Sequence, residues 1–439
     1  MLKLFHEHPE FNEYSSFDTT TGRMSLLTAT EFHALLPAPL PEVNGEYVQH
    51  ASWPGFEVFT GANPSTHTRF PRRIYFQITR NCNLECPACF IKAHHGGAHV
   101  PVEAVMQMVG FMARHGLVEV RLTGGEPTLH PNFIEIFNAF QTAGIYVSVG
   151  TNGVISRRTL EFLADARGYW LICSLDGDKT THNSYRGDTY DTIIGNLRFL
   201  RDRNPSLRIR LTTVLTKQNM GQMWHLGEVC RDIGAESITI IPLRPQVRDP
   251  AIKSLMVSSG EFRKVIETMV EIRAAMGVRF TTTIETDYKE QIERDPVFTK
   301  RSSCAAGREG TNLDYDEATK MFQVYGCSYS PASDLVASPE IREPFLAGTF
   351  GLDDLDKFLA IWRDELRWTL FRDLSLKSEA CGKCRYLHHH LCTGSCPIQN
   401  VDYDSLQLGN DVLEQLREQI SATTEWYCYH QVAGEKISD

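Results

Sequence analysis

The chain has 439 residues and a mass of 49.7 kDa, which is enough for two or three domains with complete hydrophobic cores. Hydrophobic residues make up 42% and charged residues 22%, and no run of about 18 apolar residues predicts a membrane span. The formal charge of −10 argues against a nucleic-acid partner, because such proteins need clustered positive charge to displace counterions.

Cysteine is the residue type that narrows the possibilities most. The sequence contains 12 cysteines, and its first residues, MLKLFHEHPEF, show no apolar core of the secretory type. We therefore expect a cytoplasmic protein. A reducing compartment keeps disulfide bridges open, so cysteines at ligand-like spacing favour metal binding there.

Residues 1–70 predict a small N-terminal α+β domain. Within it, residues 14–36 read as two strands, a turn between them, and a short helix for which Thr28 or Thr30 is a suitable N-cap. Residues 37–71 are rich in Pro, Gly and Asn and predict an irregular connection. The hairpin and helix are interpreted either as a peptide-binding or gating element or as a plain structural cap.

Residues 81–90 read NCNLECPACF and directly follow a predicted strand. Three residues separate Cys82 from Cys86, and two separate Cys86 from Cys89. Three thiolates at this spacing can hold three corners of an iron–sulfur cube and leave the fourth iron free for another ligand. A zinc site would be expected to show paired CxxC units, and a disulfide cluster would suit a small secreted chain.

With Phe90 after the last cysteine, this motif resembles the signature of the radical S-adenosylmethionine (radical SAM) superfamily. The resemblance implies a [4Fe-4S] cluster held by Cys82, Cys86 and Cys89, with SAM bound at the free iron. It also implies reductive cleavage of SAM to a 5′-deoxyadenosyl radical, which removes hydrogen from an unactivated carbon. An electron donor such as flavodoxin or ferredoxin is then expected as a partner.

Strand-like and helix-like segments alternate from residue 73 to about 285, which predicts parallel strands joined by crossover helices. Six strands are predicted at residues 73–79, 118–122, 146–150, 169–175, 207–215 and 237–241, with helices at 101–115, 131–143, 192–203, 221–233 and 261–276. This order matches the α/β fold of the resembled family, a partial (β/α)6 TIM-like barrel, which we assign to residues 71–300.

Glycine and polar residues follow these strands, where ligands of parallel α/β folds bind. Gly124 and Gly125 allow close backbone approach, and the Glu126 carboxylate can accept from an ammonium group; the resemblance assigns this GGEP motif to the amino group of SAM. Ser174 and Asp176 point to one face, so both can reach a single ribose. The resemblance assigns them to the ribose of SAM.

Three further residues are predicted SAM neighbours. Asn152 ends the third strand in the sequence GTNG, and Asn219 follows the fifth strand. Arg186 suits the methionyl carboxylate, because guanidinium groups match carboxylates, although an ordinary surface salt bridge is the alternative. Cys173 and Cys230 occupy apolar positions and are interpreted as buried core residues. His94, His95 and the run 388–390 are interpreted as solvated or locally hydrogen-bonded, not as metal ligands.

The C-terminal region, residues 301–439, is predicted as a separate cysteine-rich domain. Its seven cysteines are Cys304, Cys327, Cys381, Cys384, Cys392, Cys396 and Cys428. The sequences CAAG, YGC and CGKCRYLHHHLCTGSCP resemble the SPASM extension, which carries two auxiliary [4Fe-4S] clusters. The resemblance implies that Cys381, Cys384, Cys392 and Cys428 hold one cluster, and that Cys304, Cys327 and Cys396 hold the other with an open or non-cysteine position.

Two features of this region depart from the family pattern. Seven residues separate Cys384 from Cys392 where five are usual, and Phe322 stands at a usual glycine position. Both departures preserve the number and order of the cysteines. A zinc-bound, purely structural extension is the alternative to the two clusters.

The leading functional hypothesis is a peptide maturase that crosslinks or dehydrogenates a ribosomally made precursor peptide. The alternative is an oxidase, dehydrogenase or epimerase of a small molecule such as a sugar or nucleoside. Sulfatase maturation is disfavoured, because Ser328 and Tyr329 follow Cys327 where relatives of that type carry an acidic residue. A non-enzymatic iron–sulfur scaffold would not need GGEP or the pair of Ser174 and Asp176. No catalytic acid or base is predicted.

Overall fold

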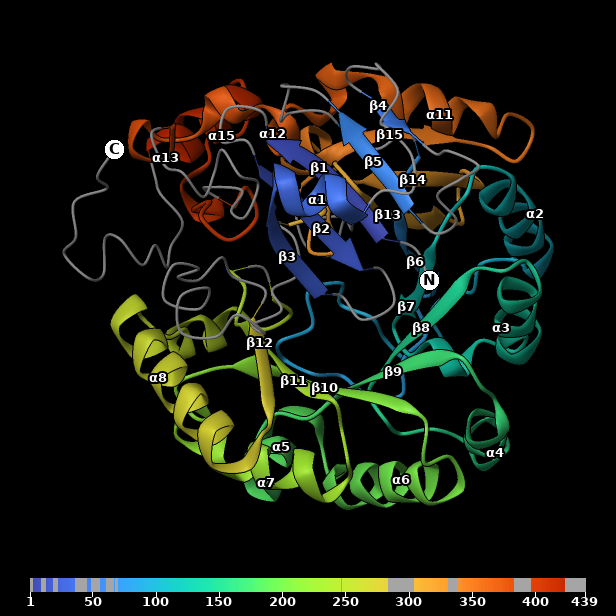
Figure 1. Ribbon diagram of the computed structural model, residues 1–439, viewed down its shortest axis with the longest axis vertical. Coiled ribbons are helices and arrows are strands. Elements are labelled where there is room, and N and C mark those ends of the chain that lie inside the picture. The colour runs from blue at the N-terminus through green and yellow to red at the C-terminus, as the bar shows by residue number, and fades with distance from the viewer. Residues whose placement is uncertain are drawn as a thin grey trace.

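Figure 1 shows the computed structural model of the chain. It describes residues 3–8, 13–18, 23–35, 46–48, 56–60, 67, 70–245, 247–282, 304–330, 338–382 and 396–422. Across these ranges no helix has both the length and the apolar character needed to span a bilayer.

A curved ten-stranded sheet, in the order β12-β11-β10-β9-β8-β7-β6-β13-β14-β15, organises most of the chain. Its parallel strands are β6 (Arg73–Thr79), β7 (Glu119–Gly124), β8 (Tyr146–Thr151), β9 (Tyr169–Ser174), β10 (Arg208–Leu215), β11 (Ser237–Pro242) and β12 (Arg279–Thr282). The predicted partial barrel is confirmed, and it gains a seventh parallel strand, β12, paired with β11.

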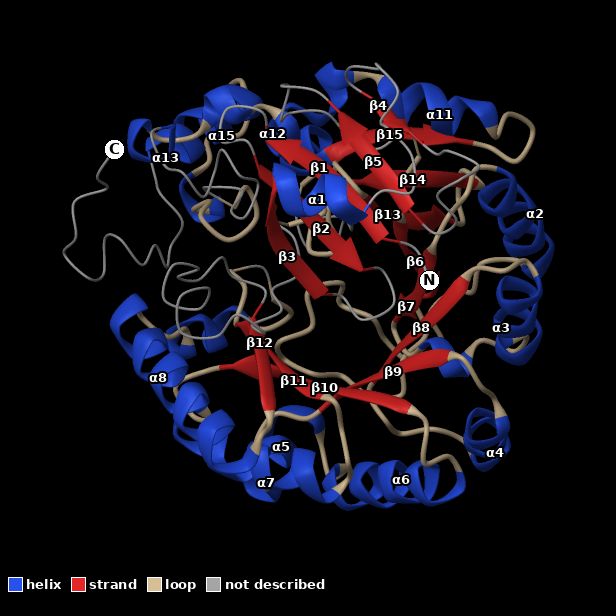
Figure 2. Ribbon diagram, in the orientation of Figure 1, coloured by secondary structure: helices blue, strands red, loops and turns tan. Residues whose placement is uncertain are grey.

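Helices cover the outer side of this parallel sheet. They are α2 (Val102–Arg114), α3 (Phe133–Thr142), α4 (Arg157–Asp165), α5 (Lys179–Arg186), α6 (Tyr190–Arg203), α7 (Met223–Asp232) and α8 (Ser259–Met276), with the short 3-10 turns η1 (Pro127–Leu129), η2 (Met220–Gln222) and η3 (Pro250–Leu255). Figure 2 shows most of these helices as an outer rim with the strands inside it. Helices α4 and α5 were not predicted from the sequence.

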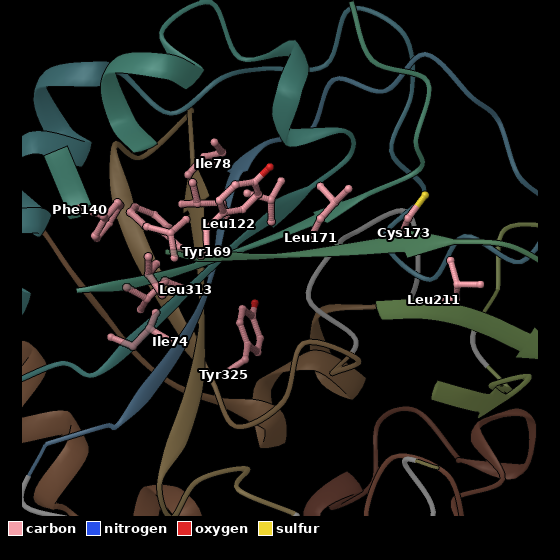
Figure 3. Close-up of a cluster of buried hydrophobic side chains, with 14 of the residues drawn as sticks. Ile74, Ile78, Leu122, Phe140, Tyr169, Leu171, Cys173, Leu211, Leu313 and Tyr325 are labelled. Carbon is pink, nitrogen blue, oxygen red and sulfur yellow. The ribbon is translucent and has the colours of Figure 1, made fainter. Parts of the chain in front are cut away.

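Alternation along the strands separates the core from the barrel interior. On β6, Ile74, Phe76 and Ile78 are fully buried in the hydrophobic core, whereas Tyr75 and Gln77 line an inner cavity. Figure 3 shows part of this core, including Ile74, Leu122, Phe140 and Leu171. The core therefore lies between sheet and helices, and the other face of the sheet is available for a site.

The C-terminal region continues the same sheet. Strand β13 (Gly310–Asp316) pairs in parallel with β6, and β14 (Met321–Tyr325) and β15 (Leu346–Phe350) follow antiparallel. Its helical segments are α10 (Pro339–Arg342), η4 (Glu343–Phe345), α11 (Asp356–Arg363), η5 (Glu365–Trp368), α12 (Thr369–Arg372), η6 (Leu374–Leu376), α13 (Glu379–Gly382), η7 (Tyr403–Ser405) and α15 (Val412–Ala422). Strand β6 therefore lies between the barrel strands and the C-terminal strands.

The N-terminal segments form a separate five-stranded sheet, in the order β3-β2-β1-β5-β4. Its elements are β1 (Lys3–His8), β2 (Glu13–Asp18), β3 (Arg23–Thr28), α1 (Ala29–Leu35), β4 (Glu46–Val48) and β5 (Phe56–Thr60). The predicted hairpin and helix correspond to β2, β3 and α1. Thr28 caps α1, because its hydroxyl accepts from the Glu31 amide at 3.2 Å while the Glu31 carboxylate accepts from the Thr28 amide at 2.8 Å.

The prediction that residues 37–71 are irregular was wrong for β4 and β5. The sequence of β5, FEVFT, alternates and is rich in aromatic and β-branched residues, as a strand requires. Its neighbours are rich in Gly, Pro and Asn, and these turn-forming residues concealed a short strand that pairs with the distant β1.

Candidate active site

A cavity of about 300 Å³ lies at the carboxyl ends of the parallel strands. Among the predicted site residues, its wall contains Cys82, Cys86, Cys89, Gly124, Gly125, Asn152, Ser174, Asp176 and Arg186. Glu126 and Asn219 are buried and do not line it. Residues from four separate strand ends therefore meet at one cavity.

The cysteine loop is held by backbone hydrogen bonds. The Cys82 amide donates to the His94 carbonyl at 3.1 Å, and the Cys89 amide donates to the Cys86 carbonyl at 3.1 Å. Burial, together with the charges of Glu126 and the other two cysteines, raises the pKa of the Cys82 thiol to about 11. Burial likewise raises the pKa of Cys86. The three thiols therefore lie near one another in a partly buried loop.

This donor set fits an iron–sulfur cube. The described residues contain no group of three or more His, Cys, Asp or Glu side chains that could hold a metal ion. A four-iron cube binds each thiolate at a different iron, so its three cysteines need not converge on one point. Three cysteines share the cavity wall, and among the residues that the structure describes no fourth thiol lines it, which matches this requirement.

Gly124 and Gly125 let the end of β7 cross the chain that leads into Cys82. A Cβ on Gly124 would lie 2.1 Å from the Thr79 carbonyl oxygen, and one on Gly125 would lie 2.2 Å from the Asn81 carbonyl oxygen. The Gly125 amide donates to Thr79 and the Glu126 amide donates to Asn81, both at 2.8 Å. The close approach expected toward a ligand is made here toward backbone, so the two motifs fix one another.

The Glu126 carboxylate is buried and occupied by protein donors. It accepts from the Thr128 hydroxyl at 2.6 Å, the Thr151 hydroxyl at 2.9 Å and the Asn152 amide at 2.7 Å. Burial raises the pKa of Glu126, and these hydrogen bonds act in the opposite direction. In this structure Glu126 positions Asn152, and its contact with an ammonium group stays a prediction.

Asn152 connects the end of β8 to the cysteine loop. Its side-chain nitrogen donates to the Asn83 side-chain oxygen at 2.7 Å and lies 3.8 Å from the Cys82 sulfur. Its own side-chain oxygen accepts from the Val154 amide at 2.9 Å, which closes the turn after the strand. Asn152 is therefore fixed by both of its polar atoms.

Asp176 and Arg186 form a buried ion pair at the cavity wall. The Arg186 Nε donates to the Asp176 Oδ2 at 2.6 Å, and the Val214 amide donates to Oδ1 at 2.7 Å. Burial lowers the pKa of Arg186, but the Asp176 carboxylate outweighs this effect and raises the pKa overall. The Arg186 Nη1 lies 3.9 Å from the Cys86 sulfur, so a fixed positive charge stands beside the cysteine loop.

Asn219 binds the backbone of two residues that form this part of the site, Asp176 and Val214. Its side-chain nitrogen donates to the Asp176 carbonyl at 3.2 Å and the Val214 carbonyl at 2.8 Å. It therefore ties the end of β9 to the end of β10, and its predicted role near adenosine stays a prediction. Ser174 lies in the cavity wall, and its contact with the ribose of SAM stays a prediction.

Two cavity residues that were not predicted from the sequence are Arg244, which follows β11, and Tyr329, which follows β14. The Tyr329 ring lies 4.5 Å from the Phe90 ring, and the Arg244 guanidinium carbon lies 4.8 Å from the centre of the Tyr329 ring. Burial raises the pKa of Tyr329 to about 12. Arg244 also donates to the Gln399 side-chain oxygen at 2.6 Å. The one sequence feature that indicates a site role for Arg244 is its position shortly after the predicted strand 237–241.

The C-terminal cysteines are described in part. Cys304 is exposed, Cys381 is buried, and Cys327 and Cys396 are half-buried. Burial raises the pKa of Cys327 to about 11, and the charge of Cys396 contributes in the same direction. Cys384, Cys392 and Cys428 lie outside the described residues.

The residues that the sequence excluded from the site lie as follows. Cys173 and Cys230 are buried in the hydrophobic core, as predicted. His94 and His95 are exposed, which agrees with a solvated role. His388 to His390 lie outside the described residues.

Comparisons with known proteins identify a matching family and several similar proteins. Residues 76–230 match the sequence pattern of the radical SAM superfamily. The AdoMet-dependent heme synthase of Methanosarcina barkeri is 23% identical over 74% of this chain and 91% of its own. The mycofactocin maturase MftC of Mycobacterium tuberculosis is 24% identical over 74% of this chain and 78% of its own.

The fold is also similar to that of Streptococcus suis SuiB. Its structure with bound S-adenosylmethionine superposes with a TM-score of 0.58 at 18% identity, covering 75% of this chain and 74% of SuiB. Its structure with the precursor peptide SuiA gives a TM-score of 0.57 at 18% identity, covering 76% and 73%. These similarities establish the fold.

Proposed function

This chain is a radical SAM enzyme, and on that premise we propose that it oxidatively modifies a ribosomally made precursor peptide by crosslinking or dehydrogenation. The observation that carries the proposal is the shared cavity, in which the three motif cysteines and the predicted SAM contacts meet. Similarity to MftC and to SuiB, which was solved with a precursor peptide, supports the peptide as the substrate class.

Cys82, Cys86 and Cys89 would hold the [4Fe-4S] cluster, with SAM beside it. When bound, the cluster and SAM supply a 5′-deoxyadenosyl radical that removes hydrogen from the substrate. Arg186 offers a fixed cation beside Cys86 for the SAM carboxylate, and Asp176 orients that guanidinium. The strand ends and Tyr329 form the cavity wall around these groups, which limits the contact of the bound groups with water.

The C-terminal cysteines are proposed to hold two auxiliary clusters. Cys304, Cys327 and Cys396 would bind one, and Cys381, Cys384, Cys392 and Cys428 the other. The mutual charge effect of Cys327 and Cys396 supports the first group. Metal analysis and visible absorbance of anaerobic protein test this assignment, and stoichiometric zinc without iron would contradict it.

The N-terminal sheet is proposed to bind part of the peptide. Within the described residues, β3 lies at one edge of the sheet and pairs only with β2. An edge strand carries unpaired backbone donors and acceptors, so an extended peptide can add to it as a further strand.

The direct test is anaerobic incubation of reconstituted enzyme with SAM, a reductant and the peptide encoded beside its gene. We expect 5′-deoxyadenosine together with a mass loss of the peptide in units of two hydrogens. Deoxyadenosine without any change in peptide mass would reject the peptide as substrate, while leaving the radical SAM chemistry in place.

A small-molecule substrate is the second candidate. The heme synthase of Methanosarcina barkeri aligns over 91% of its length with this chain. Unmodified peptide combined with turnover of a small molecule made by neighbouring gene products would favour this function.

A further inference from the structure

Basic side chains line the barrel interior below the predicted SAM contacts. In the register of the sheet, Thr212 on β10 pairs with Ser174 on β9. Arg210 precedes Thr212 by two residues and points to the same inner face, roughly 7 Å deeper along the strand. Arg210 and Arg121 both line the cavity that contains the motif cysteines. The motif cysteines therefore lie at one end of the cavity, which we call its mouth, and Arg121 and Arg210 lie on its inner wall.

Arg210 is buried, with 6% of its surface exposed. Its Nε donates to the Ser237 hydroxyl at 3.2 Å, and its guanidinium carbon lies 4.3 Å from the centre of the Trp170 ring. Among the residues that the structure describes, no carboxylate forms an ion pair with it. The indole and the hydroxyl hold the guanidinium in place without neutralising its charge.

The neighbouring inward arginines differ from Arg210 in this respect. Glu119 pairs with Arg73 at 2.6 Å and with Arg121 at 3.3 Å. On the same strand as Arg210, Arg208 pairs with Glu236 at 2.8 Å. Each of these cations has an anionic partner within the barrel.

The pKa of Arg210 is consistent with its lack of an ion-pair partner among the described residues. Burial lowers the pKa of Arg210 to about 9, and the charge of Arg121 contributes in the same direction, whereas the carboxylates of Glu236 and Glu119 act in the opposite direction without outweighing burial. A buried charge without a direct ion-pair partner is costly, so an anion that enters the cavity gains a strong partner there. The planar guanidinium can form paired hydrogen bonds with a carboxylate.

We propose that Arg210, assisted by Arg121, binds a carboxylate of the substrate. This rests on the proposed function only in that the cavity receives the substrate. The carboxylate belongs either to an Asp or Glu side chain or to a free chain terminus. With this group anchored at the inner wall, the reacting carbon is held toward the cysteine loop at the mouth.

The test uses reconstituted holoenzyme saturated with SAM, whose own carboxylate then occupies Arg186. Binding of three probes is measured by titration calorimetry in chloride-free buffer. N-acetylglutamate amide presents a side-chain carboxylate, N-acetylglycine presents a terminal carboxylate, and N-acetylglutamine amide is the neutral analogue. We expect at least one carboxylate to bind about tenfold more tightly than the neutral analogue, and the tighter of the two identifies the source of the group.

Variants of Arg210 separate binding from folding. Arg210→Gln is expected to abolish the preference for carboxylate, Arg210→Lys to retain part of it, and the exposed-site control Arg157→Gln to leave it unchanged. Removing an uncompensated buried charge is also expected to leave the thermal midpoint unchanged or to raise it. A merely structural arginine would instead lower the midpoint when replaced.

Two outcomes would overturn the proposal. One is equal binding of neutral and acidic probes by the unaltered enzyme, and the other is an unchanged carboxylate preference in folded Arg210→Gln. Neither measurement needs a peptide or turnover. Arg210-dependent carboxylate binding without peptide modification would therefore reject the peptide role and leave this subsite standing.

Discussion

The two cysteine-rich regions of the molecule are assembled in different ways. Cys82, Cys86 and Cys89 lie in one short loop that β6 and β7 hold through backbone hydrogen bonds. The C-terminal cysteines that the structure describes come from separate places along the chain. Cys327 follows β14, and Cys381 lies on α13. One region is ordered by the sheet, and the other depends on distant segments meeting.

This difference should change how much metal binding contributes to the folding of each region. A loop fixed by backbone contacts loses little further entropy when it binds a cluster. Segments that are far apart in sequence must be brought together, and metal binding then contributes directly to their folding. The barrel cysteines should therefore decide whether SAM is cleaved, while the C-terminal cysteines should affect later steps and the stability of their own region.

Replacing a barrel cysteine should have the largest effect. We expect Cys86→Ala to reduce 5′-deoxyadenosine formation by more than about 100-fold, because even indirect partners of a metal can cost that much. Iron should fall by one cluster. The matched control is Cys230→Ala, a thiol buried in the core on α7, which should retain iron and SAM cleavage. Equal losses in both variants would mean that the effect is one of folding.

Replacing a C-terminal cysteine should separate SAM cleavage from product formation. In Cys327→Ala we expect roughly four fewer irons and no modified substrate. SAM cleavage without substrate should stay within about threefold, because Cys327 itself is not one of the residues that line the cavity of the motif cysteines. Ser328→Ala, beside it in the cavity wall, should keep the full iron content. Complete loss of SAM cleavage in Cys327→Ala would show that the two regions act as one.

A glycine substitution tests whether the sheet orders the barrel loop. An alanine Cβ at Gly125 would lie 2.2 Å from the Asn81 carbonyl oxygen, so the backbone before Cys82 must move. We expect Gly125→Ala to cost about 2–4 kcal/mol of stability and to lower SAM cleavage about tenfold. In Gly195→Ala, within α6, no atom lies within 4 Å of the added Cβ, and stability should rise by about 0.5–1 kcal/mol. Thermal midpoints and deoxyadenosine assays of both variants test this prediction. Identical behaviour of the two variants would contradict the claim that the sheet orders the cysteine loop.

The sequence predicted the parts of the site that depend on local pattern. The three cysteines, the two glycines and the end of the fourth strand all line one cavity, while their contacts with a cluster and SAM stay predictions. Buried parallel strands carry continuous apolar runs, which made the six main strands visible. The short strand β12, RFTT, carries too little pattern to be recognised and is defined by its pairing with β11.

The rest of the site depends on contacts between distant residues. Glu126 meets its partners Thr151 and Asn152 only because β7 and β8 are adjacent. Tyr329 reaches Phe90 because β13 and β14 extend the sheet beyond β6. That no carboxylate among the described residues forms an ion pair with Arg210 is likewise a property of the packed interior. Local sequence patterns contain none of this information.

The smallest expected effect on turnover comes from the ion network at the base of the barrel. Burial raises the pKa of Glu119, but Arg73 and Arg121 outweigh it and lower the pKa from 4.5 to about 2. Because the pKa is lower in the folded state, this carboxylate stabilises the protein fully above about pH 4.5. That stabilisation is lost as the pH falls from 4.5 toward 2.

Glu119→Gln should therefore destabilise the protein by about 3 kcal/mol near neutral pH, and the deficit should shrink as the pH approaches 2. SAM cleavage should change little, since the network lies at the opposite ends of the strands from the cysteine loop. Thermal midpoints from pH 7 to pH 3 measure the deficit, with the exposed-site control Glu161→Gln expected to match the unaltered enzyme throughout. A deficit that stayed constant with pH would mean that Glu119 stabilises the protein through packing. The ion pairs of Glu119 with Arg73 and Arg121 would then contribute little to the stability of the barrel.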